Sequence, residues 1–222
     1  MKCRVCGKSG LFFKVNSNGL CINCEKKQHQ TVLDFEIDSE KELRKQDKEF
    51  AILVKAEELY EKDNDIEKII AVYEDVFITK QSTLNSQSRW FKLVDLYLKA
   101  GKNDKAWAWL NLLSIKHPDY LNKIEEKRLK ILKKEGRFQD AMLSLMASIG
   151  YSTSNTDRVT YYQSYGKSKF LKDAPMLIKK LKWQESDLLK LEAILSSSIT
   201  KKQFDYNLLR DKYQKFLTSK QS

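Results

Sequence analysis

The first 24 residues contain all four cysteines of the 222-residue chain, arranged as two C-x-x-C pairs. Cys3 and Cys6 form the first pair, Cys21 and Cys24 form the second, and fourteen residues separate the pairs. This spacing is typical of tetrahedral zinc sites, in which each pair supplies two thiolates from one tight turn. Because four sulfurs close the coordination shell, we expect one structural Zn²⁺ and no catalytic ion.

The residues between the two pairs predict a small β-hairpin. LFFKV (11–15) reads as one strand, NSNG as a turn and GLCIN (19–23) as a second strand. The segment CRVCGKSGLFFKVNSNGLCINC resembles bacterial zinc ribbons, which implies a zinc-ribbon-like or treble-clef-like module over residues 1–28. About 25 residues bury too little apolar surface to fold alone, so we expect zinc to contribute roughly 10–16 kcal/mol.

Two other interpretations of this end of the chain remain open. The C-x-x-C pairs could serve redox chemistry, although the βαβ pattern that accompanies a thioredoxin-like motif is missing. His29, five residues after Cys24, could also replace one of the four thiol ligands.

The composition favours a helical protein. Hydrophobic residues make up 41% of the chain and charged residues 32%, whereas the turn-forming residues number only seven glycines and two prolines. No apolar run approaches the roughly 20 residues that span a bilayer. No signal peptide precedes the first cysteine, so we expect a cytoplasmic protein without a membrane partner.

The middle of the chain contains a repeated pattern. The stretch RWFKLVDLYLKAGKNDKAWAWLNLLSIKHPDY resembles a tetratricopeptide repeat, a helix–turn–helix unit. The resemblance rests on bulky residues of a first helix, a glycine at the turn and a small residue where the helices cross: Trp90, Leu93, Tyr97, Gly101, Ala106, Leu110 and Pro118. In the next stretch Gly136, Ala141 and Leu145 each follow their counterparts by 35 residues. An earlier stretch, residues 52–77, fits less well because Ile69 stands at the small position.

This resemblance implies a mainly α fold, an α-solenoid of about three helix pairs over residues 40–150. Such pairs must stack because one pair cannot bury its own apolar face. We expect a linker at 29–39, a first long helix opened by a capping box of Ser39 and Glu42, and a helical capping region at 151–222. Asp173 predicts one helix start within that region, and Thr200 with Gln203 predicts another.

The resemblance also implies a groove, lined by the first helix of each pair, that binds a protein segment. Its acidic end comprises Val54, Glu58 and Glu61, and Asp95 belongs to its middle. The candidate partner-binding residues are Phe91, Lys123, Lys130, Lys133 and Lys134. We therefore expect the acidic portion of a bound segment to face these lysines.

Nucleic acid is the alternative partner, because the formal net charge is +11 and basic residues alternate with aromatic ones in two places. The candidate residues are Arg4, Lys8, Phe12, Phe13 and Lys14 near the cysteines, and Arg158, Lys167 and Lys169 in the second half. No specific nucleic-acid motif accompanies them.

Motifs of catalysis are missing from the sequence. It has no G-x-x-x-x-G-K-[ST] or G-x-G-x-x-G loop, and its two histidines lack recognisable partners. We expect no enzymatic activity and no small-molecule substrate.

Together these patterns predict a non-enzymatic adaptor with a zinc module and a repeat groove. A nucleic-acid-binding regulator is the first alternative, and a structural subunit of a larger assembly is the second. The high content of Lys, Asn and Ile indicates an AT-rich bacterial or phage genome.

Overall fold

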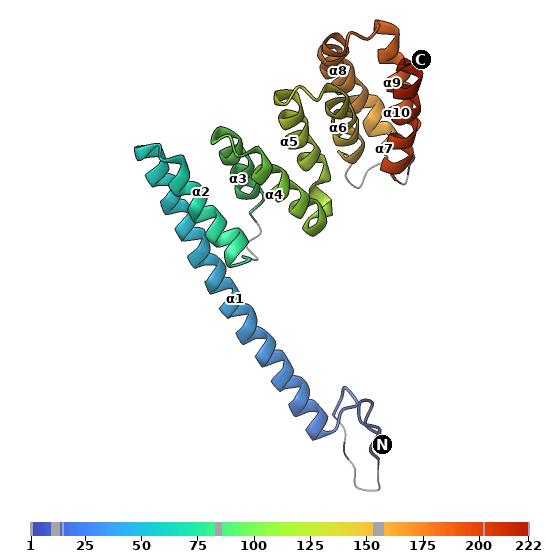
Figure 1. Ribbon diagram of the computed structural model, residues 1–222. Helices are drawn as coiled ribbons and strands as arrows, with labels where there is room; N and C mark the ends of the chain where they lie inside the picture. The colour runs from blue at the N-terminus through green and yellow to red at the C-terminus, as the bar shows by residue number, and fades with distance from the viewer. Residues whose placement is uncertain are drawn as a thin grey trace. The chain divides into compact units, whose positions relative to one another are not determined.

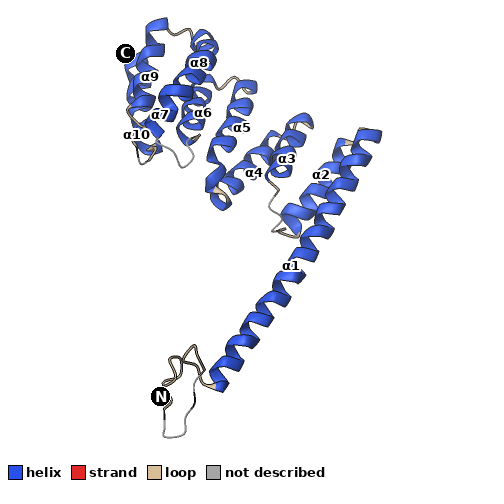
Figure 2. Ribbon diagram, turned by 180° about the vertical axis from the view of Figure 1, so that it is seen from behind, coloured by secondary structure: helices blue, strands red, loops and turns tan. Residues whose placement is uncertain are grey.

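A computed structural model describes residues 2–9, 14, 16–82, 86–152, 158–201 and 203–221, without the side chains of His29, Val32, Leu33 and Gln221. This part of the chain is mainly α, and it contains two isolated β-bridges but no strand (Figure 2). None of its helices combines the length and apolarity needed to cross a bilayer.

The described residues form ten α-helices, connected in places by short π- and 3₁₀-helical turns. In chain order the elements are α1 (Ile22–Asp63), α2 (Ile66–Glu74), η1 (Asp75–Thr79), α3 (Gln87–Lys99), α4 (Asn103–Lys116), η2 (Pro118–Tyr120), α5 (Leu121–Lys134), α6 (Phe138–Tyr151), α7 (Arg158–Tyr161), η3 (Tyr162–Gly166), α8 (Lys167–Leu181), α9 (Glu185–Ser196) and α10 (Tyr206–Gln221). They fall into two compact units, residues 1–85 and 86–222, which are described separately.

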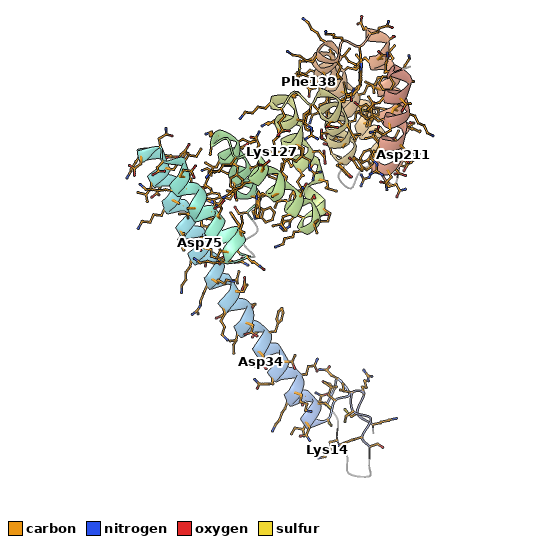
Figure 3. All side chains as sticks on the ribbon, in the orientation of Figure 1. Lys14, Asp34, Asp75, Lys127, Phe138 and Asp211 are labelled. Carbon is orange, nitrogen blue, oxygen red and sulfur yellow. The ribbon has the colours of Figure 1, made fainter. Side chains whose placement is uncertain are left out.

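The first unit is built on α1, a single helix of 42 residues (Figure 1). Its C-terminal half packs against α2, where the Tyr73 hydroxyl donates to Glu57. The Ser82 hydroxyl, just after η1, donates to Glu49 of α1. By contrast, every described side chain from residue 26 to 41 is exposed. Asp34 marks this stretch of α1, beside which no described segment of the first unit runs (Figure 3).

The expected boundaries in this region are wrong in two respects. Residues 29–39, expected to be a linker, are helical and belong to the N-terminal half of α1, which begins at Ile22. Ser39 therefore caps nothing, and its hydroxyl donates to the Glu36 carbonyl oxygen within the helix. The second expected strand is also incorrect, because Cys21 is the N-cap of α1 and Ile22 is already helical. Most of the first expected strand, residues 11–13 and 15, lies outside the described residues.

In the second unit, helices that follow one another in the chain pack side by side. Contacts join α3 to α4, α4 to α5, α5 to α6, α6 to α8, and α8 to α9, while α10 packs on α6 and α9 (Figure 1). Helix α6 lies at the centre, and every described side chain from Ala141 to Gly150 except Leu143 is buried. The region expected only to cap the array thus contains a further helix pair, α8 with α9, followed by α10.

Four turns between paired helices contain a residue with positive φ: Asn64, Gly101, Gly136 and Lys182, at 51°, 73°, 74° and 55°. Gly101 and Gly136 lie in these turns as the 35-residue spacing predicts. After Gly101 the Lys102 N–H donates to the Tyr97 carbonyl at 2.8 Å, and the equivalent bonds after Gly136 and Lys182 measure 2.9 and 3.1 Å. These bonds satisfy the last carbonyls of each first helix.

Several aromatic residues of α3 and α4 pack in the core. Trp90 and Tyr97 are buried on α3, and the buried Trp109 indole donates to the Trp90 carbonyl at 3.0 Å. Trp107 is half-buried, and its indole donates to Glu135 at 3.1 Å.

Two expected helix starts in the C-terminal region are wrong. Pro175 lies inside α8, so Asp173 starts no helix there. Thr200 and Gln203 bond to each other in the loop before α10, whose first turn is instead capped by Asp205, which accepts the Leu208 N–H at 2.9 Å.

Candidate functional site

The four cysteine thiols lie together at the start of α1. Their sulfur atoms are all within 4.8 Å of one another, and the sulfurs of Cys6 and Cys21 are 3.8 Å apart. A tetrahedral Zn²⁺ with Zn–S bonds of about 2.3 Å needs sulfurs about 3.8 Å apart. The four thiols form no disulfide, and their sulfurs lie close enough together that they could hold one metal ion.

Local hydrogen bonds explain how the first pair reaches this geometry. Gly7, with φ of 71°, lets the chain turn so that its N–H donates to the Cys3 carbonyl at 3.0 Å. The Cys3 N–H donates to the Lys8 carbonyl at 2.9 Å, which closes the turn. The Cys21 N–H then donates to the Cys3 sulfur at 3.3 Å and links the two pairs.

The second pair is positioned by an asparagine-centred turn and by the helix. The Asn16 side-chain oxygen accepts the N–H groups of Asn18 and Leu20 at 3.0 and 2.9 Å, and its amide nitrogen donates to Glu25 of α1 at 2.7 Å. This turn delivers Cys21 to the N-cap of α1, and Cys24 follows in the first turn. Thiolates here are favoured by the positive end of the helix dipole.

The electrostatics of the cluster also favour a cation. Backbone N–H groups, first that of Cys6 and then that of Cys21, lower the pKa of Cys3 to about 6. Burial, followed by hydrogen bonds with the other thiols, raises the pKa of Cys24 to about 12. Four sulfurs this close cannot all be thiolates unless a positive ion offsets their charge, so metal binding must release protons.

Basic side chains surround the thiols. A hollow of about 650 Å³ beside the cluster is lined by cysteines and by Lys8, Lys14, Lys26 and Lys27. Lys8 and Lys14 are thus where the sequence places them, and Arg4 is exposed nearby. Phe12 and Phe13 lie outside the described residues. The sequence reasoning missed Lys26 and Lys27, which a helix start at Ile22 would have placed within three residues of Cys24 in the first turns of that helix.

The second candidate site is the face of the second unit that α3, α5 and α8 share, here called the α3–α5–α8 face. Lys127 of α5 contacts both carboxylate oxygens of Asp95 on α3 at 2.6 Å, and Lys169 of α8 contacts Glu126 of α5 at 2.7 Å. Lys134 donates to the Leu98 carbonyl of α3 at 3.3 Å. These contacts bring the three helices together at one surface, on which Lys127 is visible between α3 and α5 (Figure 3).

Helical geometry places two further lysines on the middle of this face. At 100° per residue, Lys123 and Lys130 lie between Glu126, which faces α8, and Lys127, which faces α3. Both side chains are exposed, as is Lys134, whereas Lys133 is half-buried. Of the lysines that the sequence grouped, Lys123, Lys130 and Lys134 lie on this face; the grouping did not include Lys127, whose i+4 spacing from Lys123 was the available signal.

Several expected binding residues are not free to bind. Phe91 is only 8% exposed and belongs to the core, so the expectation that it contacts a partner is wrong. Lys169 pairs with Glu126, Lys167 lies 3.7 Å from Glu192, and Arg158 on α7 is half-buried. Val54, Glu58 and Glu61 lie on α1 in the other unit, with Glu58 and Glu61 exposed.

Comparison of the chain with protein-family models, with curated proteins and with solved structures finds no match.

Proposed function

We propose that the protein is a non-enzymatic scaffold that binds an acidic segment of another protein on its α3–α5–α8 face. The N-terminal cysteine module, holding one structural Zn²⁺, is its second interaction site. The observation that carries this proposal is the charge that remains on the face after its internal ion pairs are formed.

The two carboxylates that join the helices of this face are neutralised within the protein. Asp95 is paired with Lys127, and Glu126 is paired with Lys169. Lys123 and Lys130 lie between these pairs with exposed ammonium groups, and Lys134 extends the row along α5. The remaining charge is therefore positive, which attracts an acidic ligand and gives its carboxylates several donors in a row.

The arrangement of helix pairs supports a tetratricopeptide-like solenoid. Each of the pairs α1–α2, α3–α4, α5–α6 and α8–α9 is joined by a turn with one positive-φ residue. Two of these turns lie 35 residues apart, and Ala106 and Ala141 are fully buried at the equivalent close crossings. In such arrays one helix of every pair contributes to a shared binding surface.

Peptide binding tests the proposal directly. The probes are fluorescein-labelled peptides of about twelve residues rich in Asp and Glu, and matched peptides with Asn and Gln in their place. Fluorescence anisotropy at about 0.15 M salt should detect the acidic peptides and not the amide peptides. The double substitution Lys123→Glu/Lys130→Glu should weaken binding about tenfold or more, because two attractive contacts become repulsive.

A matched control carries the same change in net charge elsewhere on the second unit. Lys116→Glu/Lys215→Glu alters exposed lysines of α4 and α10 and should change the affinity less than twofold. If both double variants lose binding equally, only net charge matters and the proposed face is wrong. The proposal is also wrong if acidic and amide peptides bind alike.

Nucleic-acid binding is the second candidate, favoured by the lysines around the thiol cluster. Lys8, Lys14, Lys26 and Lys27 lie at one hollow beside the metal site. A labelled single-stranded oligonucleotide should then bind with steep salt dependence, and Lys26→Glu/Lys27→Glu should reduce binding. If the oligonucleotide binds and this variant leaves its affinity unchanged, the cysteine module is not the nucleic-acid site.

A further inference from the structure

The hairpin of α1 and α2 contains an apolar groove of about 520 Å³ that no other described segment of the first unit fills. Ile52, Ala56 and Leu59 line it from α1, and Ile69 and Val72 line it from α2. Ile52 and Leu59 keep 42% and 51% of their surface exposed, although they are among the most apolar side chains in the groove. Exposed apolar surface concentrated in this way is typical of a contact with another macromolecule.

The rim of the groove has a symmetrical distribution of charge. Lys55 and Asp63 of α1 both line it and lie four residues before and four residues after Leu59. Each is therefore about one helical turn, roughly 6 Å along the axis, from Leu59 and close to the same side of the helix. On α2 the rim carries one further opposite pair, Lys68 and Asp65, whose side chains are 3.0 Å apart.

We propose that this groove is the interface through which two copies of the chain form an antiparallel dimer. A twofold axis through Leu59 places the two Leu59 side chains against each other. The same axis brings Lys55 of each copy to Asp63 of the other, so that two ion pairs flank the apolar centre. The surface is thus complementary to itself, as a twofold interface requires.

The charges on the rim of the groove favour a second copy of this chain as its occupant, rather than an acidic ligand of the kind proposed for the second unit. The rim carries two lysines and two aspartates and has no net charge to attract a charged segment. Two helical hairpins that stack by their apolar faces give a four-helix arrangement, in which antiparallel helices pack at about 20°. This dimer goes beyond the scaffold function and does not depend on it.

The test uses the full-length, zinc-loaded protein in the presence of a reductant, so that the cysteines form no intermolecular disulfides. Sedimentation velocity between about 1 and 200 µM should show the mass rise from one chain to two, the range in which an interface of modest size associates. Lys55→Asp alone and Asp63→Lys alone should each weaken association at least tenfold, because each places like charges opposite one another.

An equimolar mixture of these two variants gives the sharpest result. In the mixed dimer the aspartate introduced at position 55 of one chain faces the lysine introduced at position 63 of the other. The unchanged Asp63 of the first chain faces the unchanged Lys55 of the second, so association should return to the wild-type level. Leu59→Glu should abolish it, whereas Asp47→Lys, at an exposed position of α1 outside the groove and about 120° around the helix from Leu59, should leave it unchanged. Circular dichroism of each variant checks that the helices are intact.

A protein that keeps the mass of one chain at every concentration overturns the proposal. So does a dimer that tolerates both Lys55→Asp and Asp63→Lys, or one that the mixture of the two variants fails to restore. In each case the two chains do not meet about Leu59.

Discussion

Asp187 on α9 is a carboxylate that the fold holds almost entirely out of water, with 1% of its side chain exposed. The Lys220 ammonium of α10 contacts its Oδ2 at 2.5 Å, and the Gln184 N–H donates to the same oxygen at 3.0 Å. Lys190 lies 3.6 Å from the other oxygen. Asp187 thereby caps α9 and ties the last helix of the chain to it.

Removing the ammonium group of Lys220 should destabilise the second unit. We expect Lys220→Met to lower the free energy of unfolding by about 2 kcal/mol, because a buried carboxylate loses its closest counter-charge. The lysine is itself 26% exposed, so the loss should stay below that of a fully buried pair. Urea unfolding followed by tryptophan fluorescence measures it, with Lys215→Met on the exposed side of α10 as the control. Equal stability of the two variants would show that the contact contributes nothing.

The same pair should make stability depend on pH in the acid range. Burial raises the pKa of Asp187, but the Lys220 contact and the Gln184 N–H outweigh it, so the pKa lies below its ordinary value of 3.8. The ionised form therefore stabilises the fold above about pH 4, and this contribution is lost as the pH falls through the lowered pKa. The difference in unfolding free energy between wild type and Lys220→Met should be constant at neutral pH and shrink below the ordinary pKa of 3.8. A difference that persists in strong acid would contradict this assignment.

At the scale of the elements, the inter-helix turns show how far the sequence determines the fold. Gly101 and Gly136 adopt positive φ, and no atom lies within 4 Å of the place where a Cβ would be added at either. Lys182 adopts the same conformation with a side chain, which costs an L-residue roughly 1–2 kcal/mol. The turn at Lys182 thus repeats the geometry of the turns at Gly101 and Gly136 without a glycine.

Exchanging these two residue types should move stability in opposite directions. Lys182→Gly should raise the free energy of unfolding by about 1 kcal/mol, because glycine reaches positive φ without steric cost. Gly136→Lys should lower it by a similar amount, and the double variant should return close to wild type because distant sites add. Chemical denaturation of the three proteins gives the values. A loss of stability in Lys182→Gly would mean that the lysine side chain makes a contact worth more than the backbone strain.

The regular turns explain which elements could be predicted. The 35-residue spacing identified α3 to α6, since a glycine, a small crossing residue and a leucine recur there in register. It failed for α8 and α9, because their turn residue Lys182 follows Gly136 by 46 residues rather than 35, and α7 and η3 lie within that interval. The position of Lys182 could not be recognised from a glycine pattern.

The start of α1 was missed for a different reason. Ser39 and Glu42 match a capping box by spacing alone, but a capping box acts only where N–H groups lack partners, and α1 has already begun at Ile22. The thiol cluster, in contrast, followed directly from the sequence, because four ligands at fixed spacing leave few geometries. The α3–α5–α8 face required the fold, since Asp95 and Lys127 lie 32 residues apart in the chain.

At the scale of the whole molecule, the clustered cysteines and the tryptophans belong to different units of the chain. All four cysteines belong to the unit of residues 1–85, whereas Trp90, Trp107, Trp109 and Trp183 all belong to that of residues 86–222. The apolar core of the second unit includes α6, α8 and α10 and no residue of the cysteine module. Removal of a metal ion from the cysteines should therefore change the folding of the cysteine module and leave the stability of the second unit almost unchanged.

Chelation of the metal tests whether the two units are stabilised independently. After the proposed Zn²⁺ is removed with EDTA under reducing conditions, the unfolding midpoint monitored by tryptophan fluorescence should shift by less than about 1 °C, since the four cysteines lie outside that core. Backbone amides of residues 2–9 and 16–24 should exchange with deuterium at least tenfold faster, because we expect the metal to provide most of the folding energy of the module. Restoring excess Zn²⁺ should reverse the change. A shift of several degrees in the tryptophan transition would show that the metal supports the second unit.

The length of the exposed stretch of α1 also sets the direction in which the cysteine module points around the helix axis. Each residue of an α-helix advances about 1.5 Å and turns about 100°, so the number of residues between Cys24 and the α1–α2 hairpin sets the direction in which the cysteine module points. Deleting one residue would swing the module about 100° around the helix axis while barely changing its distance from the hairpin. Deleting seven residues would return it to within about 20° of its original direction and draw it about 10 Å closer. The distance of the cysteine module from the hairpin and its direction around the helix axis can therefore be varied independently.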